Sequence, residues 1–224
     1  MPRSSRMPNC PFTPPSKPQD DPAGPLGPGP GGRPFPKPTL PDPRMNDMQP
    51  AVQIDVDEAS GIWRTDGLPM VYVPRHFMVN MHKEIEKTLG RDAYEAMLDR
   101  SGAKSAFFWC KRQSELLGAS ERDVFALYLR RLSERGWGRF SIEQLDLDQL
   151  AAQVTLRDSI YVLESEGQAA APTCYMFEGF LIGAMQFVCA MRGIDPQAIT
   201  CREVQCAAMG AAECRFEVSC VLTD

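Results

Sequence analysis

The sequence lacks several features that define common functional classes. Its 224 residues include 24 Lys and Arg against 29 Asp and Glu, a net charge of −5, so no basic surface for nucleic acid is expected. No apolar run reaches the roughly 18 residues of a membrane helix, and no apolar signal-peptide core is present near the N-terminus. These absences favour a soluble cytoplasmic protein without a nucleic-acid or membrane partner.

Motifs for nucleotide-dependent chemistry are also missing. There is no Gly-x-x-x-x-Gly-Lys-Ser phosphate loop and no Gly-x-Gly-x-x-Gly dinucleotide fingerprint. The two histidines, His76 and His82, are six residues apart on one predicted helix, a spacing that does not place them on one face. We therefore interpret both as ordinary helix residues. Without a hydride source or a histidine centre, an enzyme is not favoured.

Proline is concentrated in one segment. Fifteen of the 20 prolines lie in the first 44 residues, together with five glycines and few aliphatic side chains. Such a segment cannot bury enough apolar surface to offset the entropy lost on ordering. The sequence predicts a disordered Pro/Gly-rich tail over 1–50, a helical N-terminal region over 51–135 and a C-terminal domain over 136–224.

Apolar periodicity predicts helices in the first half of the folded part. A helix over 76–89 is indicated by four apolar residues at four-residue spacing, which are Phe77, Met81, Ile85 and Leu89. A second helix begins at Asp92 and is expected to break near Gly102, and another spans 105–117. A last helix over 120–134 opens with an N-cap serine and an acid three positions later.

The period changes in the second half of the chain. Strands are expected over 137–147 and 159–164, and 173–191 is predicted to be a buried helix because it is apolar on nearly every side. Alternating segments over 199–206 and 213–220 predict a closing β-hairpin. Helices followed by strands indicate an α+β fold with helices packed on an antiparallel sheet.

The C-terminal hairpin carries a compact set of metal-ligand residue types. Eight cysteines without an export signal favour a reducing compartment, where thiols are metal ligands or buried small residues. Glu203, Cys206 and Cys214 lie on the hairpin, and Cys174 lies at the head of the apolar helix. Three thiolates and a carboxylate form a four-coordinate shell of the kind that zinc prefers.

Strand geometry sets a condition on this site. Glu203 and Cys206 would point to opposite faces of a regular strand, so both can bind one metal only if a bulge lies at 204–205. Each cysteine taken by itself is better explained as a buried small residue than as a metal ligand. The set favours a metal because Glu203 has no apolar role. Four protein ligands leave zinc no open position, so the predicted site is structural.

The hairpin also resembles a known family. Glu203-Val-Gln-Cys206, followed after seven residues by Cys214 with Gly210 between, is similar to the C-terminal signature of the 4-vinyl reductase domain family. That family includes a bacteriochlorophyll-associated protein and the N-terminal sensory domains of phenol- and xylene-responsive bacterial activators. The resemblance covers about 154–220 and places Cys174 as the first zinc ligand.

Several expectations follow from the resemblance. It implies that 136–224 is a 4-vinyl reductase-type zinc-binding domain with a TRAPP-like ligand-binding fold and a zinc-bound hairpin. It also implies homodimers, because sensory members pair through their N-terminal helices. Without an ATPase module or a helix-turn-helix, a sensor of this kind must act through a partner protein.

Aromatic residues are more numerous than a closed zinc site needs. We therefore expect a pocket for a small hydrophobic or aromatic molecule, lined by Trp109, Trp137, Phe140, Tyr175 and Phe180. The favoured function is a zinc-stabilised sensory or accessory protein for such a ligand. The alternatives are an accessory or catalytic 4-vinyl reductase-like protein in tetrapyrrole or aromatic metabolism, and a zinc-containing dimerisation module without ligand.

One acid interrupts the apolar helix. Glu178 is costly to bury unless it is paired, and buried carboxylates of this kind often mark functional sites. We expect a structural pair with Arg202 or Arg157. A proton donor for a reductase is the alternative.

Overall fold

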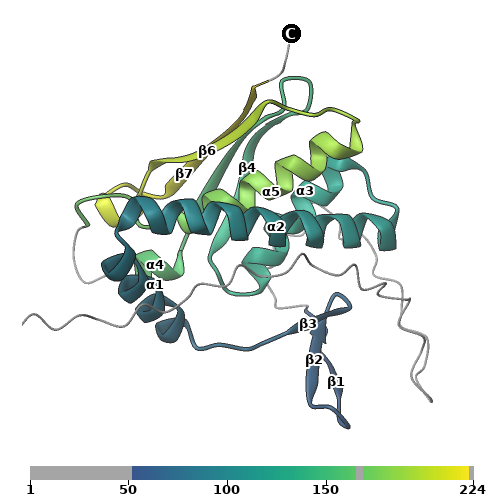
Figure 1. Ribbon diagram of the computed structural model, residues 1–224, viewed down its shortest axis with the longest axis horizontal. Helices are drawn as coiled ribbons and strands as arrows, with labels where there is room; N and C mark the ends of the chain where they lie inside the picture. Colours follow the sequence, from purple (N-terminus) through teal and green to yellow (C-terminus); the bar gives the residue numbers. More distant parts are fainter. Residues whose placement is uncertain (1–51, 165–168, 222–224) are drawn as a thin grey trace, which may run out of the picture. The chain divides into compact units, whose positions relative to one another are not determined.

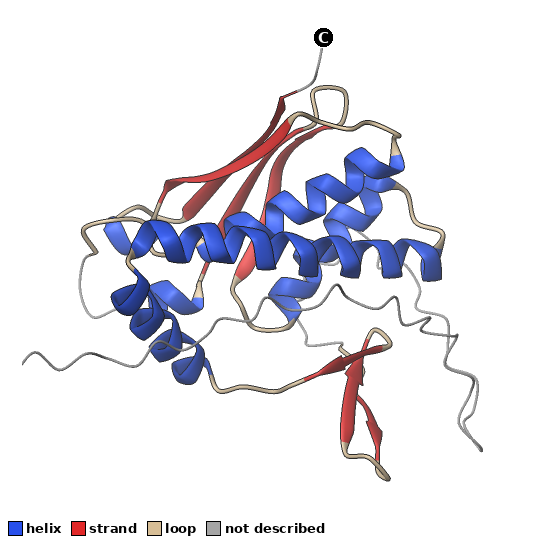
Figure 2. Cartoon of the chain, in the orientation of Figure 1, coloured by secondary structure: helices blue, strands red, loops and turns tan. Residues whose placement is uncertain are grey.

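The computed structural model describes residues 52–164 and 169–221, which belong to one compact unit (Figures 1 and 2). The predicted disordered tail over 1–50 lies outside the described residues. Within these two ranges, no helix is long and apolar enough to cross a bilayer. The elements in chain order are β1 (Asp55–Asp57), β2 (Ile62–Thr65), β3 (Leu68–Met70), α1 (Arg75–Leu89), α2 (Arg91–Leu117), α3 (Glu121–Glu134), β4 (Arg139–Asp146), β5 (Ala151–Arg157), α4 (Ile160–Leu163), α5 (Met176–Met191), β6 (Ala198–Gln205), the 3-10 turn η1 (Ala207–Met209) and β7 (Cys214–Val221).

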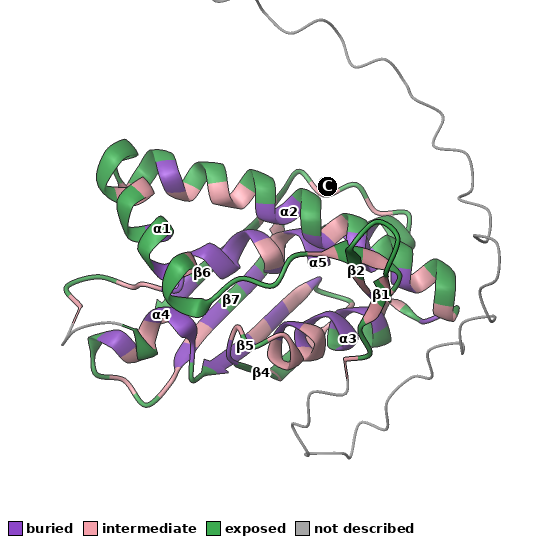
Figure 3. Cartoon of the chain, turned by 90° about the horizontal axis from the view of Figure 1, so that it is seen from below, coloured by how far each residue is buried: buried purple, intermediate pink, exposed green. Residues whose placement is uncertain are grey.

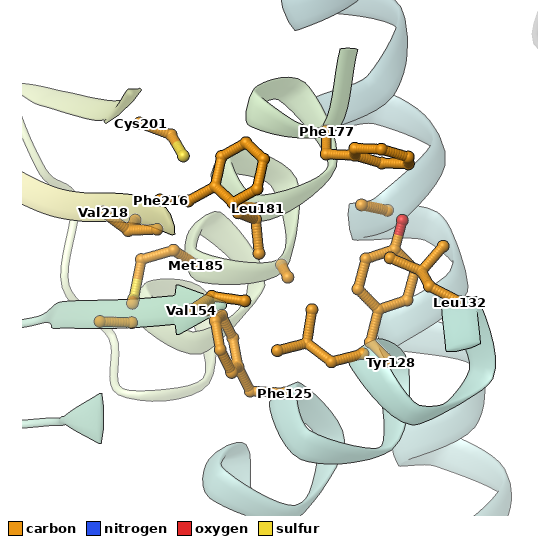
Figure 4. Packing of buried hydrophobic residues seen from close by; sticks show 14 of the residues in the cluster. Phe125, Tyr128, Leu132, Val154, Phe177, Leu181, Met185, Cys201, Phe216 and Val218 are labelled. Atoms are coloured by element: carbon orange, nitrogen blue, oxygen red, sulfur yellow. The ribbon is translucent and has the colours of Figure 1, made fainter. Parts of the chain in front are cut away.

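The predicted α+β class with an antiparallel sheet is confirmed. Four strands pair antiparallel in the order β4-β5-β7-β6, and the predicted C-terminal hairpin is the β6–β7 pair. Helix α5 packs on this sheet, and α2 packs along α5 (Figure 1). Alternate residues of β7 point inward, so Phe216 and Val218 meet Leu181 and Met185 of α5 in the core (Figure 4).

The predicted break of the second helix at Gly102 is wrong. Helix α2 is continuous, and Gly102 lies where it crosses α5. A Cβ built on Gly102 would lie 3.0 Å from Phe180 Cδ1 and 3.1 Å from the backbone of Gly179. The glycine permits close helix packing there, which a sequence pattern cannot distinguish from a helix end.

The predicted strand over 159–164 is also wrong. This segment forms the short helix α4, and Ser159 is its N-cap, accepting a hydrogen bond from the Tyr161 amide at 3.3 Å. The strand that pairs between β4 and β7 is β5, which sequence reasoning did not identify. Local alternation at Ile160–Leu163 is outweighed by the cap and by the burial of Ile160 and Tyr161.

The predicted helix over 76–89 is confirmed as α1, but its apolar stripe does not face the interior. Phe77 and Leu89 are 53% and 50% exposed, whereas Val79 and His82 are buried. Most of α1 has the colour of exposed residues in Figure 3. The inner face of α1 therefore carries a histidine. The two histidines consequently differ, since His76 is exposed.

The N-terminal strands β1, β2 and β3 form a separate antiparallel sheet. Its β2–β3 turn is fixed to the helices through Asp66, whose φ of 54° is in the left-handed region. The Asp66 carboxylate pairs with Arg131 at 3.0 Å and with Arg135 at 2.9 Å, and Gln113 donates to its backbone carbonyl. These polar contacts attach the small sheet to α2 and α3.

Candidate metal centre

Four buried side chains from three parts of the chain converge beneath the β6–β7 hairpin. Cys174 lies just before α5, Glu203 on β6, Cys206 just after β6, and Cys214 at the start of β7. One ligand atom from each residue lies within 4.8 Å of the others. The structure thus brings together the whole ligand set inferred from the sequence, including Cys174, which is 29 residues from Glu203.

The bulge that this site requires is present. The β6–β7 register pairs Glu203 with Phe216 and Gln205 with Arg215, so one residue of β6 is unmatched between them. The extra residue is Val204, which is exposed. The predicted bulge at 204–205 is confirmed, and it lets Glu203 and Cys206 face the same side.

The spacing of the thiols fits a tetrahedral metal ion. With Zn–S bonds of about 2.3 Å, two sulfurs of a tetrahedral site are about 3.8 Å apart. The Sγ atoms of Cys174 and Cys214 are 3.7 Å apart. The Oε1 atom of Glu203 is buried without a hydrogen-bond partner among the described residues, an arrangement that is costly without a cation. The donor set and its spacing fit zinc.

Each of the four side chains is hydrogen-bonded by a neighbouring group. Groups around the ligands of a metal site commonly orient them in this way. The Cys174 amide donates to Glu203 Oε2 at 2.8 Å, the Thr173 amide to Cys206 Sγ at 3.5 Å, and the Ala207 amide to Cys214 Sγ at 3.3 Å. The Ser159 hydroxyl lies 3.0 Å from Cys174 Sγ. Sequence reasoning missed these residues, although Thr173 and Ala207 adjoin ligands.

The electrostatics of the cluster are those of a site crowded with acidic groups. Hydrogen bonds from the Cys174 and Cys214 thiols lower the pKa of Cys206, which favours its thiolate. Burial raises the pKa of Glu203 well above its usual range. The buried cluster therefore favours protonation at some positions, and a divalent cation would bind in exchange for those protons.

Glu178 of α5 contacts the backbone of Glu203. Its carboxylate pairs with Arg202 at 2.9 Å and accepts a hydrogen bond from the Glu203 amide at 2.8 Å. Burial raises the pKa of Glu178. The predicted pairing with Arg202 is confirmed, whereas Arg157 pairs with Glu213 at 2.7 Å. Glu178 thus positions the backbone of the strand that carries Glu203.

Four of the five predicted ligand-binding aromatics lie in one packed layer. Phe180 contacts Trp137 at 6.2 Å between ring centroids, Phe140 lies 5.2 Å from Phe177, and Trp109 lies 5.2 Å from Tyr128. Tyr128 in turn is 6.5 Å from Phe180. Within the described ranges the Trp109 Nε1–H is buried and has no acceptor. An unused indole donor in an aromatic layer can bind a ligand oxygen.

Tyr175, the fifth predicted residue, lies apart from this layer. Its ring is 5.1 Å from the His82 ring, and His82 also contacts Tyr161 at 4.4 Å. The Tyr175 hydroxyl donates to the Glu86 carboxylate, and the Arg91 guanidinium lies 4.3 Å from the Tyr175 ring centroid. No sequence pattern indicates this cluster, because its members come from α1, α2, α4 and the start of α5.

In the described part of the chain, two cavities adjoin these elements, and neither is lined by the five predicted residues. One, of about 530 Å³, lies between α3, β4 and Arg192 and is walled mainly by polar side chains. The other, of about 270 Å³, lies between α1, α4 and residues 169–173, with His82 in its wall. The second cavity lies close to Tyr175, because Glu86 and Arg91 in its wall both contact that tyrosine.

Comparisons with known proteins support the fold. Residues 48–143 match the model of a family described as "Domain of unknown function (DUF5943)". No curated protein matches the sequence. The phenol-responsive sensory domain of the transcription activator PoxR, whose structure was solved with phenol, superposes with a TM-score of 0.61 at 20% identity, over 75% of this chain and 84% of that chain.

Two further solved structures are more distant. A trafficking protein particle complex subunit 3 from Naegleria fowleri, covalently bound to palmitic acid, has a TM-score of 0.47 at 12% identity, covering 67% of this chain and 98% of its own. A vinyl-4-reductase family protein from Methanocaldococcus jannaschii has a TM-score of 0.43 at 13% identity, covering 68% and 84%. At the level of fold, the PoxR sensory domain confirms the resemblance identified from the hairpin.

Proposed function

We propose that this protein is a zinc-stabilised domain that binds a small apolar or aromatic molecule and acts as a sensor or accessory through a partner protein. The observation that carries the proposal is the buried cluster of Cys174, Glu203, Cys206 and Cys214, on a fold shared with a phenol-responsive sensory domain. Aromatic side chains packed beside that cluster supply the apolar surface that such a ligand needs.

Zinc would be structural in this proposal. With Cys174, Glu203, Cys206 and Cys214 all coordinated, no position stays open for a substrate. The ion would cross-link the β6–β7 hairpin to the start of α5, and its binding energy would add to folding stability because the ligands converge only in the folded chain. Glu178 and the neighbouring amides would keep the ligands in place.

The ligand in this proposal is small and aromatic. The fold shared with the PoxR domain, which was solved with phenol, supports an aromatic molecule of this kind. Trp109, Trp137, Phe140 and Phe180 pack into one aromatic layer and line neither of the two cavities described above. None of the seven cysteines in the described part forms a disulfide bond, which supports a reducing, cytoplasmic location. We further propose a homodimer, to which the exposed apolar side chains Phe77 and Leu89 of α1 would contribute.

Two measurements on the purified full chain test the proposal. Elemental analysis should give close to one zinc per chain, and Cys206→Ser should abolish retention of zinc and lower the melting temperature. The matched control is Cys220→Ser, which removes a thiol of the same strand pair outside the cluster. Native mass spectrometry should detect a co-purifying small molecule. A metal-free chain that is fully folded would refute the zinc site.

A further inference from the structure

The geometry points to the 270 Å³ cavity between α1, α4 and residues 169–173 as a binding site for a monocyclic aromatic carboxylate. The inference rests on the proposed ligand-binding function and names a site and a chemical class for it. The predicted aromatic residues do not line this cavity, whereas a buried histidine and three charged side chains do.

The size and lining of the cavity suit one ring. A cavity of roughly 150 Å³ can hold benzene, so 270 Å³ accommodates a six-membered ring with a substituent. Its apolar walls are Val79 of α1, the Tyr161 ring of α4 and the small side chains of 169–171. Val79 and Tyr161 are buried in the core, so these two walls are fixed rather than formed on binding.

Charge at the cavity selects an anion. The Glu86 carboxylate accepts the Tyr175 hydroxyl, and the Arg91 guanidinium lies over the same Tyr175 ring, so this acid already has favourable neighbours. Two cationic side chains, Lys83 and Arg91, line the cavity against this one carboxylate. The exposed Lys83 ammonium donates to the Glu164 backbone carbonyl at 3.4 Å. A ligand carboxylate would form a charge-assisted hydrogen bond with this ammonium.

His82 provides a directional contact. Its Nδ1 is 3.0 Å from the Tyr94 hydroxyl, and its ring is stacked among three tyrosines. The imidazole lies in the cavity wall, and within 52–164 and 169–221 its other nitrogen, Nε2, has no hydrogen-bond partner. Nε2 is therefore available to a polar substituent of a ligand, and its orientation is set by the tyrosines.

The cavity is physically connected to the candidate metal centre. Thr173 lines the cavity, while its amide and hydroxyl lie 3.5 Å and 3.7 Å from Cys206 Sγ. The next residue, Cys174, is itself one of the four clustered ligands. A ligand that contacts 169–173 would therefore touch the segment that leads into the metal cluster.

Calorimetric titration of the zinc-loaded full chain tests this site with three matched probes: benzoate, phenol and benzylamine. We expect benzoate to bind most tightly, because only its charge complements Lys83. Lys83→Met should weaken benzoate binding at least about tenfold, because it removes the charged donor of a charge-assisted hydrogen bond. The control is Lys87→Met, one turn further along α1 and outside the cavity.

A second variant guards against indirect effects. Ala169→Leu would place a larger side chain in the cavity wall and should abolish benzoate binding while the melting temperature stays within a few degrees of wild type. Binding of benzoate unchanged in both Lys83→Met and Ala169→Leu would overturn the cavity site but leave the proposed ligand-binding function intact. Tighter binding of phenol or benzylamine than of benzoate, or no benzoate binding, would overturn the carboxylate class.

Discussion

At the contact between α2 and α5, replacing glycine by alanine should destabilise the protein, although the same replacement stabilises most helices. Replacing glycine by alanine inside a helix normally stabilises a protein by about 1 kcal/mol, because alanine loses less backbone entropy on folding. Gly179 and Gly183 lie one turn apart on α5 and face the backbone of α2. We expect Gly183→Ala to destabilise the protein in spite of its better helix propensity.

The magnitude can be worked out from the geometry. A Cβ on Gly183 would lie 2.2 Å from the Ala103 carbonyl oxygen, and ordinary contact begins near 3.4 Å, so the helices would have to separate locally by 3.4 − 2.2 = 1.2 Å. The obstructing atoms are backbone and cannot rotate away. Overpacking of this kind costs about 1–3 kcal/mol or more, which exceeds the gain in propensity.

A graded series makes the test sharper. The nearest atom to the added Cβ is at 2.2 Å for Gly183, 2.6 Å for Gly179 and 3.0 Å for Gly102, where it is the movable Phe180 ring. The free energy of unfolding, measured by urea denaturation at fixed zinc concentration, should therefore fall most for Gly183→Ala, less for Gly179→Ala and least for Gly102→Ala. A Gly183→Ala protein as stable as wild type, or the reverse order, would refute the packing argument.

Two further predictions concern buried polar groups. Burial lowers the pKa of His82 from 6.5 to about 4. As the pH falls below 6.5, this histidine takes up a proton in the unfolded chain before it does so in the folded protein. The free energy of unfolding should therefore decrease between pH 6.5 and 4, by up to about 3 kcal/mol. Denaturation between pH 7 and 4 should show a smaller loss of stability in His82→Gln, and the same loss as wild type in the control His76→Gln. An equal dependence of stability on pH in all three proteins would exclude His82 as the source. Asp66→Ala should destabilise the fold by about 3 kcal/mol, because among the described residues the buried Arg135 guanidinium would lose its ion-pair partner, whereas Arg131 would keep Glu134. A thermal melt equal to wild type would show that the turn is not attached as described.

The sequence by itself determined the features that depend on neighbours along the chain. The β6–β7 hairpin, the apolar helix α5 and the N-cap of α3 at Ser120 follow from local periodicity and capping. The bulge between Glu203 and Gln205 could also be inferred, because one metal requires both Glu203 and Cys206 on the same side of a strand of period two.

Only the tertiary structure decided the features that join distant segments. Gly102 has the local pattern of a helix end, and the backbone of α5 shows that it is a helix crossing instead. His82 lies on a helix whose apolar stripe faces outward, so no periodicity indicates its burial among tyrosines from three other segments. Such contacts depend on packing between elements far apart in the chain, which local propensity does not encode.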